Sequence, residues 1–162
     1  MPEAGDADLL IRDIDWLITV DPGRRILRDG AVAVKDGRIL AVGKTAELAR
    51  TFAGTKEFSA RGHVVTPGFV DCHLHSSFQL SRGLADEANA QSFLFDRMYP
   101  YEAALEAEDV QVSATLAASE LLRHGVTCFV DPGNYHPEAS VEGVMSTRSE
   151  EHTSELQSLR HL

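Results

Sequence analysis

The sequence predicts an α/β fold in which a group of N-terminal β-strands precedes a strand–helix–strand unit. Short runs of β-forming residues separated by turn residues fill residues 8–65. A Pro-Gly turn then leads into an apolar run that ends in a His-x-His motif at residues 73–75. A helical pattern over residues 106–124 leads into a second apolar run at residues 126–131. This order implies two parallel strands joined by a right-handed crossover.

Length and composition are those of an ordinary globular domain. The chain has 162 residues, of which 43% are hydrophobic and 25% are charged. No apolar run approaches the ~20 residues that cross a bilayer, and the acidic start lacks the pattern of a secretory signal. The formal net charge of −10 argues against binding a nucleic-acid backbone, which requires clustered Lys and Arg. We therefore expect a cytoplasmic protein that binds neither a membrane nor a nucleic acid.

The first third of the chain is expected to form a small sheet. The expected elements are strands at residues 8–12, 16–20, 30–34 and 38–43, one or two helical turns at 44–50, and an edge strand at 58–65. Asp36-Gly37 between two β-branched runs predicts a tight hairpin, because glycine takes the positive φ that such a turn needs. Strands of this kind must pack against another sheet or domain.

His73 and His75 close the apolar run that follows the Pro-Gly turn. Successive side chains of a strand point to opposite faces, so both imidazoles are expected on one side. Val70, Cys72 and Leu74 would then face a packing layer. Two imidazoles on one face can chelate a single divalent metal ion. The alternative is two ordinary histidines at a strand end, because short motifs carry false positives.

The stretch between the two apolar runs is expected to be a long loop at residues 76–96, followed by the helix. Its apolar side chains would either close over a site or hold the loop down. These side chains are Phe93, Leu94, Phe95, Met98 and Tyr99. In the helix, apolar residues recur at i, i+3 and i+4, and Gly125 terminates it. His124 is expected to be a cation at the helix end rather than a ligand.

Four further residues have side chains that could bind a ligand or react, but each is expected to have a structural role. Cys72 and Cys128 lie in apolar runs and are expected to be buried core residues, not a disulfide. Asp131 and His136 follow the second apolar run, at the end where parallel α/β folds place their sites. As isolated residues they are expected to form turns.

Residues 64–75, which read Val-Val-Thr-Pro-Gly-Phe-Val-Asp-Cys-His-Leu-His, strongly resemble the first barrel strand of the amidohydrolase superfamily. Its members are metal-dependent (β/α)8-barrel hydrolases with a small β-sandwich made partly from the N-terminal segment. The resemblance implies a β-sandwich portion at residues 1–65 and the first βαβ portion of the barrel at residues 66–147. A barrel needs roughly 250 residues, so the other ligands and acid/base groups are expected on later strands.

Within the superfamily, the chain is most similar to deaminases of methylthioadenosine, adenosylhomocysteine and related purines, with the triazine hydrolases nearby. Shared features are an Arg-Gly-x-Ala-acid segment at residues 82–86 and a Pro-x-Glu at residues 100–102. In the nucleoside deaminases that Glu binds the ribose hydroxyls, which makes Glu102 the candidate substrate-binding residue. A Trp common upstream is Phe93 here. The alternative for Glu102 is a solvated carboxylate at a helix start.

The resemblance implies a metal-dependent hydrolase of C–N bonds other than peptide bonds, specifically an aminohydrolase of a purine nucleoside or another N-heteroaromatic substrate. His73 and His75 would bind one divalent metal ion, zinc or alternatively iron, since imidazole suits both. The metal would lower the pKa of water toward ~7, and a carboxylate would carry a proton to the departing ammonia. Asp71 would form a hydrogen bond below the site or fill the barrel interior. A homo-oligomer is one option for the full-length protein.

Two alternative functions remain. The first is a cyclic-amide hydrolase of the hydantoinase type, with two metals bridged by a modified lysine; the segments at residues 82–86 and 100–102 favour the deaminase. The second is a non-functional truncated product. Residues 148–157 match the translation of a common sequencing adapter, so we interpret residues 148–162 as an artefactual tail. We expect the gene to continue past Thr147 and the chain as written to be poorly folded and inactive; the codons of the tail would decide its origin.

Overall fold

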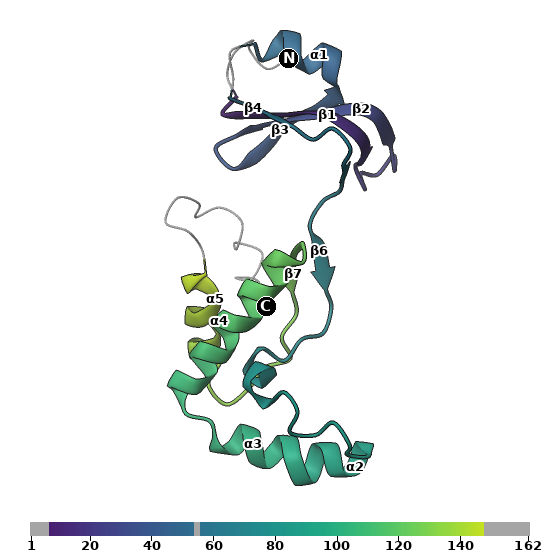
Figure 1. The fold of residues 1–162 in the computed structure, drawn as a ribbon. Coiled ribbons are helices and arrows are strands. Elements are labelled where there is room, and N and C mark those ends of the chain that lie inside the picture. Colours follow the sequence, from purple (N-terminus) through teal and green to yellow (C-terminus); the bar gives the residue numbers. More distant parts are fainter. Residues whose placement is uncertain (1–6, 54–55, 148–162) are drawn as a thin grey trace. The chain divides into compact units, whose positions relative to one another are not determined.

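The computed structural model describes residues 7–53 and 56–147, which fall into two compact units, Met1–Pro67 and Gly68–Leu162 (Figure 1). Both strands and helices are present, so the mixed α/β content expected from the sequence is confirmed.

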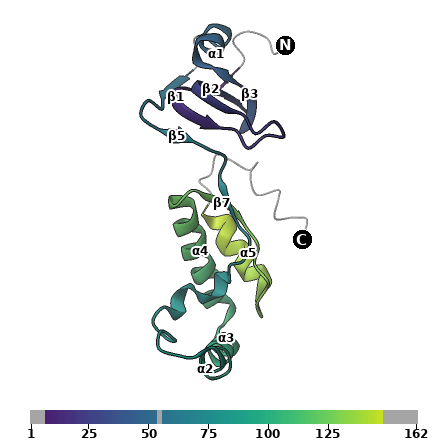
Figure 2. The same cartoon turned by 90° about the vertical axis from the view of Figure 1, so that its right-hand side faces the viewer.

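Residues 7–53 and 56–67 of the first unit form a five-stranded sheet with one helix. Its elements are β1 (Leu9–Ile18), β2 (Ile26–Lys35), β3 (Arg38–Lys44), α1 (Thr45–Thr51), β4 (Lys56–Ser59) and β5 (Val64–Val65). The strand order is β3-β2-β1-β4, and β5 also pairs with β1. The first three strands are antiparallel, whereas β4 and β5 run parallel to β1. Helix α1 lies against the sheet (Figure 2), where Leu48 joins a core cluster with Leu10 and Phe52.

The predicted hairpin and the predicted helical turns are both confirmed. Asp36 and Gly37 connect β2 to β3 with φ of 49° and 69°, the positive values that a tight hairpin turn requires. Two predicted strands merge into β1, with an irregularity between Ile11 and Ile14 where Asp13 has φ of 57°. The predicted edge strand is interrupted and forms β4 and β5. A β-bulge lets one strand bend without ending, which alternation in the sequence does not reveal.

The second unit contains a parallel strand pair and a series of helices. Its elements are β6 (Phe69–Asp71), the 3-10 helix η1 (Ser76–Ser81), α2 (Ala90–Ser92), the π-helix η2 (Phe93–Met98), α3 (Tyr99–Ala104), α4 (Ala107–Arg123), β7 (Val126–Phe129) and α5 (Pro137–Ser146). Strands β6 and β7 pair in parallel, which confirms the predicted strand–helix–strand unit. Helix α4 starts with a capping box between Glu106 and Asp109, and it ends before Gly125, whose φ is +80°.

The core of the second unit lies where α4, α5 and β7 meet. Ala114 and Ala118 of α4 form a buried cluster with Phe129 of β7 and Val144 of α5. Gly143 permits the close approach of α5 to α4, because a Cβ at this position would lie 2.4 Å from the Gln111 carbonyl oxygen. The small residues of α4 therefore permit close helix packing, and the core includes Phe129, the last residue of β7.

Three expectations about this unit were wrong. Residues 76–96 are not a loop: η1, α2 and η2 occupy much of them. Cys72 is exposed and Cys128 only partly buried, although both are free thiols as expected. Val70 is 59% exposed, since the described residues place no layer over it. Short apolar strands predict burial only when neighbours cover both faces, and β6 pairs only with β7 in the part of the chain described.

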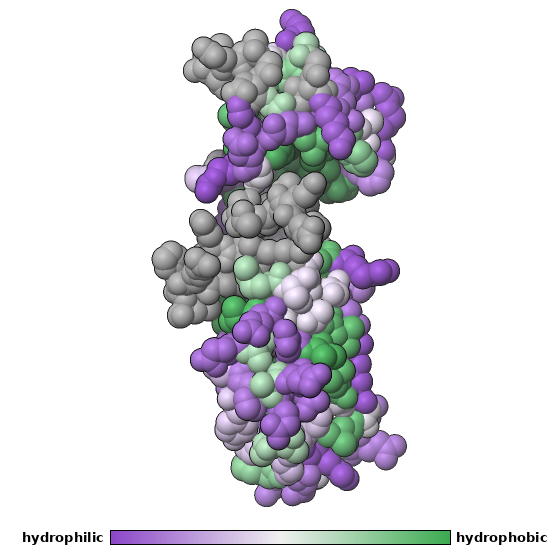
Figure 3. Space-filling model, turned by 90° about the vertical axis from the view of Figure 1, so that its left-hand side faces the viewer, coloured by the Kyte–Doolittle hydropathy of each residue, from purple (hydrophilic) through white to green (hydrophobic). Residues whose placement is uncertain are grey.

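Apolar side chains remain exposed on each unit, and Figure 3 shows green areas on both. They include Ile39 and Phe58 of the first unit, and Leu122 and Val141 of the second. Within the described ranges, no helix has the length and apolar character needed to span a membrane. The interpretation of residues 148–162 as a tail concerns residues outside those ranges.

Candidate functional site

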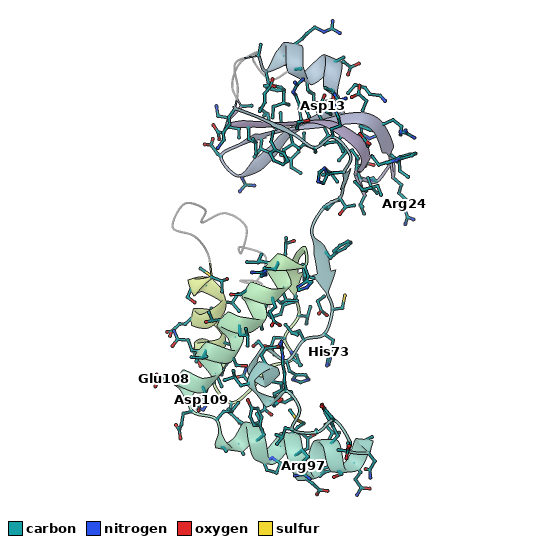
Figure 4. All side chains as sticks on the ribbon, viewed as in Figure 1. Asp13, Arg24, His73, Arg97, Glu108 and Asp109 are labelled. Atoms are coloured by element: carbon teal, nitrogen blue, oxygen red, sulfur yellow. The ribbon has the colours of Figure 1, made fainter. Side chains whose placement is uncertain are left out.

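The two histidines lie next to each other, although not on the strand as predicted. Strand β6 ends at Asp71, and His73 and His75 occupy the segment between it and η1 (Figure 4). The backbone at His75 is still extended, with φ of −90° and ψ of 100°. The two ring centroids are 5.1 Å apart at an interplanar angle of 74°. The alternation of an extended chain thus brings both imidazoles together beyond the assigned strand.

Hydrogen bonds to the end of β7 keep this segment extended. The Val130 amide donates to the Asp71 carbonyl at 2.9 Å, and the Leu74 amide donates to the Val130 carbonyl at 3.0 Å. The Leu74 side chain packs against the core cluster of α4, α5 and β7. Leu74 therefore anchors one side of the segment, and alternation turns the neighbouring histidines away from that anchor.

His75 has an aromatic neighbour and an unpaired nitrogen. Its ring stacks on Phe78 at 4.7 Å with an interplanar angle of 9°, and Phe78 meets Tyr101 edge-on at 6.2 Å. The buried Nδ1 of His75 has no hydrogen-bond partner among the described residues. Buried polar atoms normally have partners, so an unpaired nitrogen indicates an interaction that the described protein atoms do not provide.

These features fit one side of a metal centre. Neutral imidazole is a common zinc ligand, and catalytic zinc sites use three protein ligands and an open position. The described part of the chain has no group of three or more His, Cys, Asp or Glu residues that could hold an ion. His73 and His75 can therefore supply two ligands, and a complete centre requires others.

Asp71 forms a local hydrogen bond, and its two expected roles, a hydrogen bond below the site or filling of the barrel interior, stay predictions. Its Oδ1 accepts a hydrogen bond from the His73 amide at 3.1 Å, so the carboxylate turns back onto its own backbone. This contact resembles the local turns that Asp forms with the amide two residues later. Asp71 therefore helps to direct the chain as it leaves β6 toward His73.

Glu102 is half-buried on α3, and the structure does not bring it into contact with the histidines. Its carboxylate has no hydrogen-bond or salt-bridge partner in the described ranges. The adjacent Tyr101 links α3 to the site, because its ring contacts Phe78 and its hydroxyl donates to the Ser77 carbonyl at 3.5 Å. Burial, and secondarily the charge of Asp109, raises the pKa of Tyr101. The substrate-binding role of Glu102 thus stays a prediction.

The arginine of the segment at residues 82–86 has a structural partner. Arg82 Nη1 donates to Glu120 Oε1 of α4 at 2.9 Å, its Nη2 bonds Glu120 Oε2, and Nη2 also donates to Gln79 at 2.6 Å. Hydrogen bonding to Glu120 raises the pKa of Arg82, and the same contact lowers the pKa of Glu120. Arg82 thereby fastens the end of η1 to α4, and its guanidinium is not directed at the histidines.

The apolar side chains expected to cover a site or hold a loop behave differently from one another. Met98 is buried, with 3% of its surface exposed, and helps to hold η2 in place. Phe93, Leu94, Phe95 and Tyr99 are exposed to between 38% and 60%. Of these five side chains, only Met98 is buried and holds the segment in place. A role of the other four in covering the site stays a prediction.

The structure also reveals a buried polar cluster beneath the histidines that sequence patterns did not indicate. Ser76, Ser77, Ser113 and Ser140 are buried, and Asp131 bonds both the amide and the hydroxyl of Ser76. Asp131 also accepts a hydrogen bond from the Gly133 amide at 2.9 Å, which confirms its expected role in a turn. Its second role, the contact with Ser76, was not predicted. Serines that follow an apolar run resemble loop residues, and only the packing of α4 and α5 shows their burial.

Among residues 68–147 of this unit, the two other histidines have structural contacts, as expected. The His124 ring lies 2.7 Å from the Glu120 carbonyl at the end of α4. The His136 amide donates to the Asn134 side chain at 2.8 Å, and its Nε2 lies 3.1 Å from the Leu105 carbonyl. Both rings are therefore engaged with backbone carbonyls, and among residues 68–147 this leaves His73 and His75 as the histidine pair available to a ligand.

Comparison with protein families gives two matches. Residues 64–151, which include the histidine pair, match the model of the amidohydrolase family. Residues 30–54, which include the hairpin and α1, match an imidazolonepropionase-like composite domain of bacteria.

Curated relatives are named as deaminases. The chain is 38% identical over 125 residues to a 5-methylthioadenosine/S-adenosylhomocysteine deaminase of Syntrophobacter fumaroxidans, and 38% identical over 126 residues to a 5'-deoxyadenosine deaminase of Methanosarcina mazei. Each alignment covers 77% of this chain and 28% of the relative. The chain therefore matches little more than a quarter of the length of these enzymes.

Solved structures show the same fold. An adenosine deaminase from Xanthomonas campestris with bound zinc has a TM-score of 0.72 at 30% identity, and the match covers 90% of this chain and 33% of that one. The atrazine chlorohydrolase from Arthrobacter aurescens, complexed with zinc, has a TM-score of 0.71 at 22% identity, covering 85% and 33% of the two chains. At 22% identity, the similarity to the chlorohydrolase is evidence for the fold alone.

Proposed function

Because the chain belongs to the amidohydrolase family, we propose that residues 1–147 are part of a metal-dependent enzyme that deaminates a purine nucleoside or a related N-heteroaromatic substrate. The observation that carries the proposal is the histidine pair: two imidazoles 5.1 Å apart, one of them with an unpaired buried nitrogen. The deaminase names of the relatives indicate the reaction class.

The proposal includes the architecture of the complete enzyme. Residues 1–65 would contribute to a small β-sandwich, and residues 66–147 would form the first βαβ portion of a (β/α)8 barrel. The parallel pair of β6 and β7 with α4 between them supports this assignment. We use "full-length protein" for a gene product that contains residues 1–147 and has the length of the relatives. The 162-residue chain alone would be inactive, because two imidazoles do not complete a zinc site.

Zinc is the proposed metal, with His73 and His75 as two of its ligands. A zinc-bound deaminase structure of the same fold at 30% identity supports this choice. When bound, the metal supplies Lewis acidity that makes water reactive near neutral pH. The extended segment presents both imidazoles on one side, and the Phe78 ring holds the plane of His75. Glu102 would orient the substrate through its ribose hydroxyls, and the partners would be this small molecule and water in the cytoplasm.

Ammonia release by the full-length protein tests the reaction. We expect zinc-dependent ammonia release from adenosine, 5'-deoxyadenosine or methylthioadenosine, with one zinc per active site, measured by a coupled ammonia assay and by metal analysis. The 162-residue chain is the matched control and should release none. Two metals per site together with hydrolysis of a cyclic amide, and no nucleoside deamination, would contradict the proposal and support a hydantoinase-type enzyme.

The role of Glu102 has its own test. Glu102→Ala in the full-length protein should raise KM for a nucleoside about 10- to 100-fold, since hydrogen bonds to a charged group contribute about 1.5–3 kcal/mol. For a free base, which has no ribose, kcat/KM of the Glu102→Ala variant should equal that of the unmodified protein. Glu108→Ala, which removes an exposed carboxylate from the first turn of α4, is the control. Equal losses for the nucleoside and the free base would show that Glu102 does not bind ribose.

A further inference from the structure

The hydrogen bonds between the two strand ends stop just before the second histidine. The Asp71 carbonyl and the Leu74 amide both bond Val130, and no backbone hydrogen bond to β7 or the residues after it is formed by His75 within the described ranges. The position of the His75 ring, which also stacks on Phe78, therefore depends on what holds the chain immediately after it. That residue is Ser76, which is completely buried.

Beyond the end of the strand pairing, Asp131 holds the chain in place. Its Oδ2 accepts hydrogen bonds from the Ser76 amide at 3.1 Å and from the Ser76 hydroxyl at 2.5 Å. Its Oδ1 accepts from the Gly133 amide at 2.9 Å, which fixes the plane of the carboxylate. Hydrogen bonds to an ionised acceptor are roughly twice as strong as neutral ones. One carboxylate thus binds both polar donors of the residue that follows His75.

Ser76 is also fixed from the helical side. Its carbonyl accepts a hydrogen bond from the Ser113 hydroxyl of α4 at 2.7 Å, and its hydroxyl lies 3.3 Å from that of Ser140 of α5. The amide, carbonyl and hydroxyl of Ser76 are therefore all engaged, by Asp131 after the end of β7, by α4 and by α5. A buried residue with every polar group satisfied has a single arrangement, which it imposes on its neighbours.

We propose that Ser76 and Asp131 are positioning residues that hold His75 beside His73 in the arrangement that binds the metal. The inference rests on the proposed metal role of the two histidines. Asp131 acts from the segment that follows β7, with both carboxylate oxygens engaged by Ser76 and Gly133. Its effect on the metal passes through the backbone of Ser76, so loss of either partner should loosen the same imidazole.

Zinc affinity of the full-length protein, measured by competition with a chromogenic chelator, tests the proposal. Ser76→Ala and Asp131→Asn should each weaken zinc binding about 10- to 100-fold, as loss of partners outside the ligand set does at metal sites. The visible spectrum of the cobalt-substituted protein should change in both variants, because the ligand geometry changes. Unchanged zinc affinity and cobalt spectrum in both variants would overturn the positioning role.

Thr45→Ala is the matched control for general loss of stability. Thr45 is also a buried hydroxyl with two hydrogen bonds, donating to the Gly30 carbonyl at 2.9 Å and accepting from the Asp13 amide at 3.0 Å, but it belongs to the first unit. Its loss should lower Tm and leave zinc affinity and the cobalt spectrum unchanged. Weakening of zinc binding by Thr45→Ala to the extent seen with Ser76→Ala would mean that stability alone is responsible, and would overturn the proposal.

Two further outcomes separate this inference from its premise. If Asp131→Asn loses zinc while Ser76→Ala retains wild-type affinity, Asp131 is itself a ligand and the positioning role is wrong, although the metal site stands. If the unmodified full-length protein binds no divalent metal, the proposed function and this inference both fail. Only weaker binding in both variants, with the Thr45→Ala control unaffected, supports the inference.

Discussion

Replacing His73 and His75 together by alanine is expected to abolish zinc binding and to lower the deaminase kcat/KM of the full-length protein by at least about a thousandfold. A metal acting as Lewis acid contributes several kcal/mol of transition-state stabilisation, and each 1.36 kcal/mol corresponds to about tenfold in rate. The two rings lie side by side at 5.1 Å, so their loss removes one whole side of the proposed centre. Zinc content and initial rates of ammonia release measure the effect.

His63→Ala provides the control for this experiment. His63 is exposed and belongs to the first unit, and its ring Nδ1 lies 3.0 Å from the Arg61 carbonyl. This variant should retain both zinc and activity. Wild-type zinc content in the double variant would show that the pair does not bind the metal, whatever its effect on the rate.

Phe129→Ala is expected to lower the free energy of unfolding of the full-length protein by about 3–5 kcal/mol, the usual cost of removing a buried phenylalanine ring. Phe129 is 8% exposed and packs with Ala114, Ala118 and Val144, where small side chains cannot fill the space that the ring leaves. It also ends β7, one strand position before the Val130 contacts that hold the histidine segment. Urea unfolding followed by circular dichroism measures the loss.

Phe129→Leu keeps an apolar side chain at the same position and should cost less than half as much, about 1–2 kcal/mol. This pair of variants separates the effect of cavity formation from any change in strand pairing. Losses of equal size in the two variants would show that the aromatic ring, rather than the filled volume, is what the core requires. Loss of zinc by Phe129→Ala in protein that remains folded would add evidence that β7 supports the metal site.

Much of the fold could be predicted because the interactions responsible are local. Asp36-Gly37 predicts its hairpin since few residues other than glycine, asparagine and aspartate adopt positive φ. Helix α4 carries its own signals, an apolar stripe and Gly125 after its end. The segment between β6 and α4 lacked such signals. Asn89 caps α2. The helices η1 and η2 have neither a 3.6-residue apolar period nor a side-chain cap from which they could be predicted.

The extent of burial was harder to predict than the elements themselves. Cys72 and Val70 belong to an apolar run, which indicates a core strand, but both are exposed in the described part of the chain. Ser76 and Ser113 have the sequence character of surface residues and are completely buried. Burial depends on which elements pack together, and a hydroxyl can be buried when a partner from a distant element satisfies it.

The sequence by itself determined the chemistry of the candidate site. Two histidines separated by one residue in an extended segment must lie on one side of it, and this local geometry holds although β6 ends at Asp71. Only the tertiary structure decided how that segment is held. Asp131 is 55 residues from Ser76, and Ser113 and Ser140 reach it from two different helices. No spacing rule relates residues so far apart, because their distance depends on how β7, α4 and α5 pack.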